Sequence, residues 1–156
     1  MRRQISKKEF KGLLKILEDN GFKLLKDISL KGAYAVALGK NIEVIFSGDD
    51  IPLIVSVDKH IIPFIGSINY FSNFRVAYVD RGAVRPITNG ADVMAPGIKG
   101  GEFLEGEYVV VFLESVNTPL AIGKALRNSS SLGEKGKAIK NLHYKGDRIW
   151  KLVYGD

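Results

Sequence analysis

The segment that most constrains the fold is residues 79–98, VDRGAVRPITNGADVMAPGI. Apolar residues in alternation give way to a short stretch between Gly82 and Gly90, and a second apolar alternation begins after Gly90. Glycines punctuate secondary structure, so we predict a strand that ends at Asp80, a short helix between the two glycines, and a second strand at residues 92–95. This close succession of strand, helix and strand favours a small, tightly connected β domain.

Gly82 is expected to allow a sharp turn from strand to helix, because a residue without a Cβ tolerates positive φ and close backbone approach. The first amide groups of a helix lack intrahelical partners and carry partial positive charge, which suits a phosphate oxygen. Arg81 and Arg85 flank the turn and add side-chain charge. We therefore predict an anion-binding site here. The alternative is a helix capped by Asp80 with no ligand.

Short runs of β-forming residues dominate the chain from residue 75 onward. The predicted strands are residues 75–79, 92–95, 108–114, 120–126, 138–142 and 148–153. Six short strands suit a small barrel, because closing the sheet removes the unpaired edges that an open sheet would expose. The sequence therefore predicts a β-barrel domain over residues 75–156.

The amino-terminal part of the chain begins with a predicted helix. Ser6 and Glu9 form a capping box ahead of apolar residues at helical spacing, and Asn20 with Gly21 ends the pattern. Several lysines lie on the opposite face, where a solvated surface is the default interpretation.

Three β-like runs follow, at residues 34–38, 41–46 and 53–57, with glycine-containing hairpin turns between them. The apolar segment 61–74 has helical spacing and is predicted to be a short buried helix. The expected fold class is therefore α+β, with an amino-terminal helix plus antiparallel sheet in residues 1–74 ahead of the β barrel.

The charge distribution points to a polyanionic partner. The chain has 23 Lys plus Arg against 17 Asp plus Glu, a formal net charge of +6. Residues 124–151 alone contain eight basic and two acidic residues, so the excess in this segment equals the net charge. Such a concentration of positive charge favours nucleic acid as a partner.

Several classes of chemistry are excluded by composition. The chain has no cysteine, which removes disulfides, thiolate zinc sites and cysteine nucleophiles. No apolar run approaches the roughly 20 residues that cross a bilayer, and the first residues do not build a signal peptide. We expect a cytoplasmic protein with no membrane partner.

The candidate catalytic and metal-binding residues are few. Of the two histidines, His60 gives the weaker signal, and His143 stands in an alternating strand with no neighbouring acid, so a structural role is expected. The acidic pair at residues 49–50 is typical of a turn. Residues 97–101 lack the Lys and Ser or Thr that end a P-loop, and Trp150 is predicted to fill the barrel core. No catalytic residue, cofactor or metal is predicted.

The passage of strand, glycine, short helix, glycine and strand at residues 79–98, together with NLHY at residues 141–144, resembles the PUA domain. This small β pseudo-barrel occurs in pseudouridine synthases and archaeosine transglycosylases. With a helix and an antiparallel sheet ahead of it, the whole chain resembles the malignant T-cell-amplified protein family and its archaeal counterparts.

The family resemblance implies RNA binding connected to translation. Eukaryotic members act with a density-regulated partner on the small ribosomal subunit, in initiation and in tRNA recycling. Cysteines in their amino-terminal region help to hold a metal and the partner. This chain has no cysteine, so those ligands have no counterpart here.

In PUA domains the RNA surface is formed by the glycine loop, the short helix, the following strand and the last strand. The resemblance therefore implies RNA contacts from Arg81, Gly82, Arg85, Pro86, Gly90, Ala91, Asp92, Arg148 and Lys151. Charge alone adds Lys124, Arg127, Lys137 and Lys140.

The expected function is that of a non-catalytic RNA-binding protein that binds a tRNA acceptor end or ribosomal RNA in translation initiation or ribosome recycling. Its expected partners are that RNA, the small ribosomal subunit and an initiation-factor-like protein. The alternative is an accessory or targeting subunit for an RNA-modifying enzyme of the tRNA-guanine transglycosylase or pseudouridine synthase type.

Overall fold

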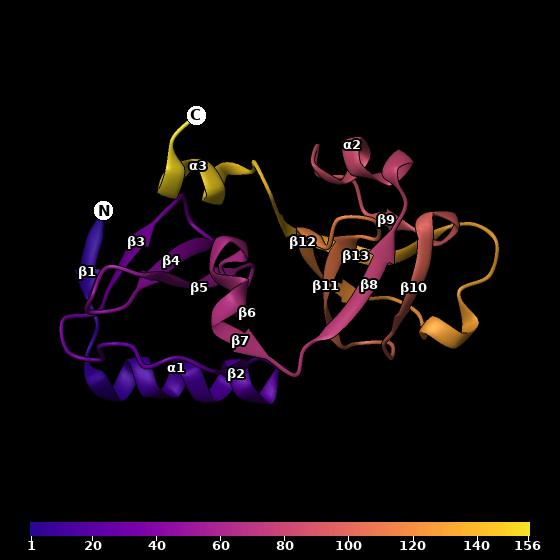
Figure 1. The fold of residues 1–156 in the computed structure, drawn as a ribbon. Coiled ribbons are helices and arrows are strands. Elements are labelled where there is room, and N and C mark those ends of the chain that lie inside the picture. Colours follow the sequence, from indigo (N-terminus) through magenta and orange to yellow (C-terminus); the bar gives the residue numbers. More distant parts are fainter. The chain divides into compact units, whose positions relative to one another are not determined.

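The computed structural model describes residues 1–156 and divides into two units, Met1–Asn73 and Phe74–Asp156. Figure 1 traces the chain from the indigo amino terminus through the first unit and into the second unit, whose colours run from magenta through orange to yellow. None of the helices has the length and the apolar composition that spanning a bilayer requires.

The first unit is built on a five-stranded antiparallel sheet. Its strands, in spatial order, are β1 (Arg2–Gln4), β3 (Tyr34–Ala37), β4 (Ile42–Phe46), β5 (Pro52–Val57) and β6 (His60–Pro63). Helix α1 (Lys7–Asp19) contacts β6 and buries Phe10 and Leu17. The predicted helix and three of these strands are confirmed, whereas β1 and β6 were not predicted.

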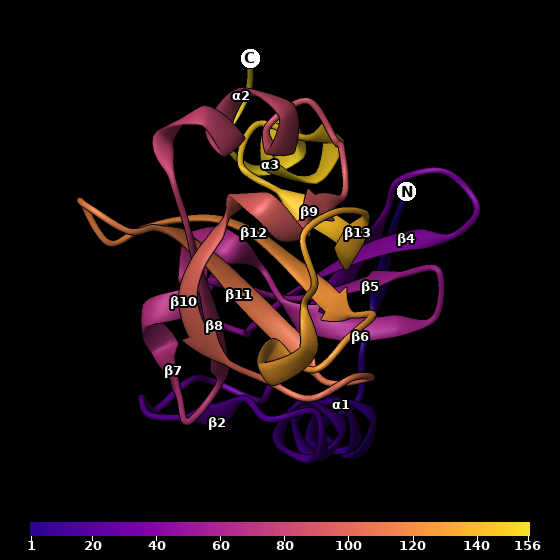
Figure 2. The ribbon, with the colours of Figure 1, turned by 90° about the vertical axis from the view of Figure 1, so that its right-hand side faces the viewer.

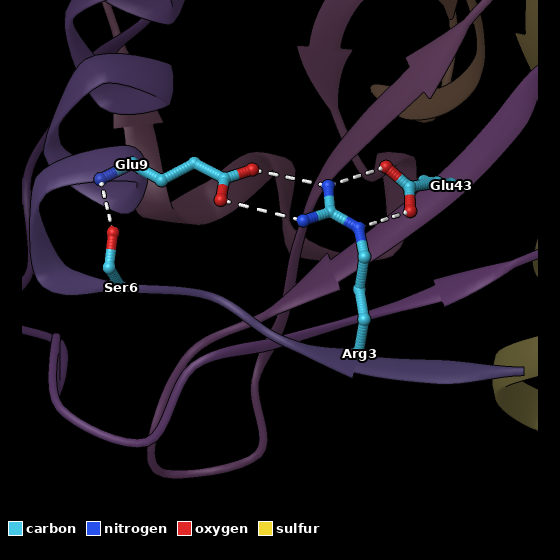
Figure 3. A network of polar contacts seen from close by, with 4 residues as sticks. All are labelled: Arg3, Ser6, Glu9 and Glu43. Atoms are coloured by element: carbon cyan, nitrogen blue, oxygen red, sulfur yellow. Dashed lines mark hydrogen bonds and ion pairs between the residues drawn. The ribbon is translucent and has the colours of Figure 1, made fainter.

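The amino terminus of α1 shows how the capping box is used. The Ser6 hydroxyl accepts a hydrogen bond from the Glu9 backbone N–H at 3.0 Å, as predicted. The Glu9 carboxylate does not return to Ser6 but binds Arg3, which also binds Glu43 on β4 at 2.9 Å (Figure 3). The hydrogen bond from Arg3 holds the pKa of Glu43 below its usual range. The guanidinium thereby ties β1 to both α1 and β4.

Residues 61–74 do not form the single helix predicted from their spacing. The segment starts in β6, continues as the 3₁₀ helix η1 (Ile65–Tyr70) and ends as β7 (Phe71–Ser72). β6 pairs with β5 across a two-residue turn, and β7 pairs with β2 (Lys23–Leu24). The helical spacing was misleading because strand pairing, a tertiary interaction, overrides local periodicity in short apolar runs.

The turn between β5 and β6 places two unfavourable residues at positive φ. Asp58 has φ 48° and Lys59 has φ 71°, between the paired residues Val57 and His60. Two-residue hairpin turns of this kind prefer Asn-Gly, because other side chains are strained there. We expect Asp58→Asn/Lys59→Gly to raise the free energy of unfolding by about 1 kcal/mol, measured by urea denaturation.

A matched control is Lys40→Gly, in the turn between β3 and β4, because Lys40 does not have positive φ. Glycine there adds only flexibility to the unfolded chain and should lower stability. The strain argument fails if glycine at position 59 destabilises the protein as glycine at position 40 does.

The second unit is a six-stranded sheet that curves round on itself (Figure 2). Its spatial order is β10 (Ile98–Glu102), β8 (Arg75–Val79), β11 (Tyr108–Leu113), β12 (Thr118–Ala125), β13 (Lys137–Tyr144) and β9 (Val93–Met94). Only the β8–β11 pair is parallel. Buried Ala77, Val109, Val111, Ala121 and Ile139 contribute to the core inside the curve. The α+β class is therefore confirmed.

The strand predicted at residues 148–153 is wrong, because this segment is helix α3 (Arg148–Tyr154). Asp147 caps it by accepting a hydrogen bond from the Trp150 backbone N–H at 2.8 Å. Trp150 is therefore half-buried on a helix, edge-on to Tyr154 with ring centroids 4.5 Å apart, and does not fill the barrel core. Strand β10 is a further strand of the sheet that was not predicted, because it contains two consecutive glycines.

The sequence interpretation found no acidic neighbour for His143, but the structure places Asp147 beside it. The His143 side chain is fully buried on β13, and its Nδ1 lies 2.7 Å from Oδ2 of Asp147. The same carboxylate accepts the Tyr144 backbone N–H at 2.9 Å. Asp147 therefore joins the end of the last strand to the start of α3.

Candidate RNA-binding site

An exposed groove of about 290 Å³ lies at the predicted glycine turn. It is formed by residues from the 3₁₀ helix η2 (Arg81–Ala83), helix α2 (Val84–Ile87), β9 and the 3₁₀ turn η3 (Ala95–Gly97). The residues that line it are Asp80, Gly82, Ala83, Pro86, Ile87, Asp92, Met94, Pro96 and Gly97. We call this hollow the PUA-side groove, after the resemblance noted above.

At the predicted Gly82 turn, one of the first helix amides has a side-chain partner within the chain. Gly82 is exposed, but it does not have positive φ, and the amide of Ala83 donates to Oδ1 of Asp80 at 3.2 Å. Asp80 thus caps the short helix, the alternative raised by the sequence. The Asp80 carboxylate therefore stands beside the amides at which a phosphate was predicted.

Two carboxylates of the groove are each accompanied by a lysine. Oδ2 of Asp92 lies 3.1 Å from Nζ of Lys137, and Oδ2 of Asp80 lies 3.8 Å from Nζ of Lys99. Both lysines are exposed. The hollow therefore combines apolar contacts, two hydrogen-bond acceptors and cations beside them, a combination that suits a heterocyclic base with amino groups and a neighbouring phosphate.

The loop between α2 and β9 is fastened to β13. Nδ2 of Asn141 donates to the carbonyl oxygens of Ile87 at 3.1 Å and Ala91 at 2.9 Å, and its backbone N–H donates to Asp92 at 2.9 Å. Gly90 has φ 94°, and a Cβ there would lie 3.2 Å from the Tyr144 hydroxyl oxygen. These contacts hold the groove in shape without a ligand.

Most of the site residues predicted from the glycine run gather at this groove. Gly82, Pro86 and Asp92 line it, Arg81, Arg85, Gly90 and Ala91 are exposed in the adjoining segment, and Lys137 pairs with Asp92. Sequence reasoning missed Lys99, Met94 and the anchoring role of Asn141. The position of Asn141 in the NLHY motif was the available signal.

The remaining predicted residues lie elsewhere. Lys124 and Lys140 face each other across β12 and β13, and Nζ of Lys124 lies 5.4 Å from the Tyr108 ring centroid. Two like charges directly opposite each other on neighbouring strands repel, so an anion bound between these two lysines would relieve the repulsion. Burial raises the pKa of Tyr108.

Three other basic residues have different surroundings from those predicted. The Arg127 guanidinium is half-buried and donates to the carbonyl oxygens of Leu132 at 2.5 Å and Lys135 at 2.8 Å, so it closes its own loop. Arg148 and Lys151 are exposed on α3, not on a last strand. No three side chains of the metal-ligand type converge anywhere in the chain.

Comparison with known proteins gives the family. The PUA domain model matches residues 76–145. An uncharacterized protein of Methanocaldococcus jannaschii is 38% identical over 153 residues, which cover 95% of this chain and 94% of that protein. Translation machinery-associated protein 20 of Saccharomyces cerevisiae is 31% identical over 131 residues, covering 71% and 72%. Its Schizosaccharomyces pombe namesake is 34% identical over 113 residues, covering 67% and 62%.

Solved structures agree over the full length. A hypothetical protein of Pyrococcus horikoshii superposes with a TM-score of 0.81 at 30% identity, covering 98% of this chain and 99% of that one. A PUA domain protein of Aeropyrum pernix, solved as a tartrate complex, gives 0.80 at 26% identity, covering 99% and 91%. The predicted PUA pseudo-barrel is thereby confirmed. The chain belongs to the family of translation machinery-associated protein 20, the malignant T-cell-amplified protein family that the sequence resembles, and its second unit contains a PUA domain.

Proposed function

We propose that this protein is a non-catalytic RNA-binding protein of the translation machinery, and that it holds a single-stranded RNA end, of the tRNA acceptor type or in ribosomal RNA, at the PUA-side groove. The PUA domain and the relatives named for their association with translation support the general role. The observation that carries the proposal is the groove itself, an exposed hollow in which each of two carboxylates has a lysine beside it.

A nucleobase is the part of the RNA that fits the hollow. Met94 and Pro96 are exposed and offer apolar contact to a base, and the carboxylates of Asp80 and Asp92 offer hydrogen-bond acceptors. Adenine, cytosine and guanine carry exocyclic amino groups that donate to such acceptors, whereas uracil carries none. Single-stranded ends expose these edges, which a duplex would hide.

The phosphates next to that base lie outside the hollow, where the cations are. Arg81 and Arg85 are exposed beside it, and Lys99 and Lys137 accompany its carboxylates. Contacts of this kind supply affinity that does not depend on sequence and that falls with salt. They also position the strand so that one base can enter the groove.

The arginine contacts are tested by charge reversal. We expect Arg81→Glu and Arg85→Glu each to weaken binding of deacylated tRNA about tenfold or more at low salt, and to make the salt dependence shallower. Fluorescence anisotropy over a salt series measures both. Arg75→Glu is the control, since it changes the net charge equally at the opposite end of β8. Its thermal midpoint is recorded as well, because Arg75 pairs with Glu107 at 3.2 Å. Equal losses in all three variants, or none, would contradict the proposal.

Base selection is tested separately, with short RNA oligonucleotides that end in CCA or in UUU. We expect the CCA end to bind more tightly by about 1–3 kcal/mol, and Asp92→Asn to reduce that preference while leaving the salt slope nearly unchanged. If the CCA and UUU oligonucleotides bind with equal affinity, the groove does not select a base, even if the arginine variants weaken binding as expected.

A further inference from the structure

The first unit has a hollow of its own, which the RNA site does not use. It measures about 350 Å³ and lies between α1 and the segment that contains β2. Its lining residues are Lys11, Leu14, Lys15, Glu18, Lys23, Leu24 and Leu30. We call it the α1 groove.

The α1 groove has an apolar lining and positive charge around it. Leu14, Leu24 and Leu30 are half-buried, so each keeps part of its side chain open to the hollow. Lys11 and Lys23 are exposed, and no carboxylate lies within ion-pair distance of either. A solvated helix face, the default interpretation, accounts for the lysines but not for three leucines left open beside them.

The net charge of the α1 groove is positive, although one of its lysines, Lys15, has an acidic partner. Nζ of Lys15 lies 3.2 Å from Asp19, one turn further along α1. Glu18 is the only acidic residue in the lining, against three lysines. An occupant must therefore bring both negative charge and apolar side chains.

The dimensions favour a helix. The α1 residues of the lining are spaced i, i+3, i+4 and i+7, so the hollow runs along two turns of α1. Ridges at this spacing accept the side chains of a second helix. RNA fits less well, because no aromatic ring lines the hollow for base stacking and leucines offer no hydrogen bonds to base edges.

We infer that the α1 groove is a docking site for an acidic amphipathic helix of a partner protein, whose leucine-type side chains contact Leu14, Leu24 and Leu30 while its carboxylates pair with Lys11 and Lys23. This is recognition of a helix in a groove, with apolar anchors at i, i+3, i+4 and i+7. The site is independent of the RNA site, so it gives the protein a second kind of partner.

The test uses the full ¹⁵N-labelled chain and a synthetic peptide of about 15 residues, made of alanine and glutamate with leucines at i, i+3, i+4 and i+7. We expect saturable chemical-shift changes at the amides of Lys11, Leu14, Lys23, Leu24 and Leu30. Lys11→Glu/Lys23→Glu replaces only exposed side chains and should raise the Kd about tenfold. The matched control, Lys8→Glu/Lys40→Glu, changes the charge equally outside the groove and should bind as the parent does.

Two further probes complete the experiment. A peptide with the same leucines and lysine in place of glutamate should give no saturable shifts. Leu24→Glu should abolish binding, with the thermal midpoint recorded to show that the unit stays folded. The inference is overturned if the acidic peptide does not bind, if it binds elsewhere, if the basic peptide binds equally, or if single-stranded RNA produces the same shifts.

Discussion

Gly101→Ala is expected to lower the free energy of unfolding of the second unit by about 3 kcal/mol or more. Gly101 has φ 106°, and a Cβ there would lie 2.0 Å from the Val76 carbonyl oxygen and 2.9 Å from the Cα of Ala77. Both atoms belong to the backbone of β8, which is paired on both sides by β10 and β11. Because backbone cannot rotate away as a side chain would, the strands must separate or shift register.

Gly106→Ala separates this clash from the cost of the backbone conformation. Gly106 also has positive φ, 88°, but nothing lies within 4 Å of an added Cβ. It should cost only about 1 kcal/mol. Urea unfolding can be followed by the fluorescence of Trp150, the single tryptophan, which lies in the second unit. Equal losses for the two variants would show that β8 yields to the methyl group, contrary to the argument.

The parts of the fold that could be predicted are those with local signals. Ser6 caps α1 through its own hydroxyl, and the hairpin strands at residues 34–38 and 41–46 are set by alternation and a glycine turn. The strand and short helix predicted within residues 79–98 are confirmed, because strand, turn and short helix are all encoded within those residues.

The parts that could not be predicted depend on pairing or on competition between side chains. Residues 148–153 have β-forming composition, but the Asp147 cap starts a helix there. At the site, the sequence is compatible with a phosphate or with Asp80 at the helix amides, and in the structure the adjacent Asp80 accepts the Ala83 amide. Asn141 on β13 comes to the groove only through strand order.

Asp147→Ala is expected to lower the free energy of unfolding by about 3 kcal/mol. The substitution removes the cap of α3 and the acceptor for the Tyr144 N–H, and it leaves the buried Nδ1 of His143 without this carboxylate. Asp80→Ala is the matched control, because it also removes a helix cap but has no buried histidine, and it should cost about 1 kcal/mol. Thermal or urea unfolding of both variants measures the difference, and similar losses would reduce Asp147 to an ordinary cap.

The same carboxylate should make stability depend on pH in the acid range. Burial alone would raise the pKa of Asp147, but the hydrogen bond and charge of His143, with the Trp150 and Tyr144 amides, outweigh it and leave the pKa below its ordinary value. The unfolded chain, with a pKa of about 3.9, therefore takes up the proton first as pH falls. The contribution of this charge is complete above about pH 5 and is lost as the pH falls through the folded-state pKa.

Asp147→Asn keeps an acceptor for the cap but has no such titration. The stability advantage of the parent over Asp147→Asn should therefore shrink on acidification below about pH 4, and an advantage that stays constant down to pH values where both states are protonated would contradict the assignment.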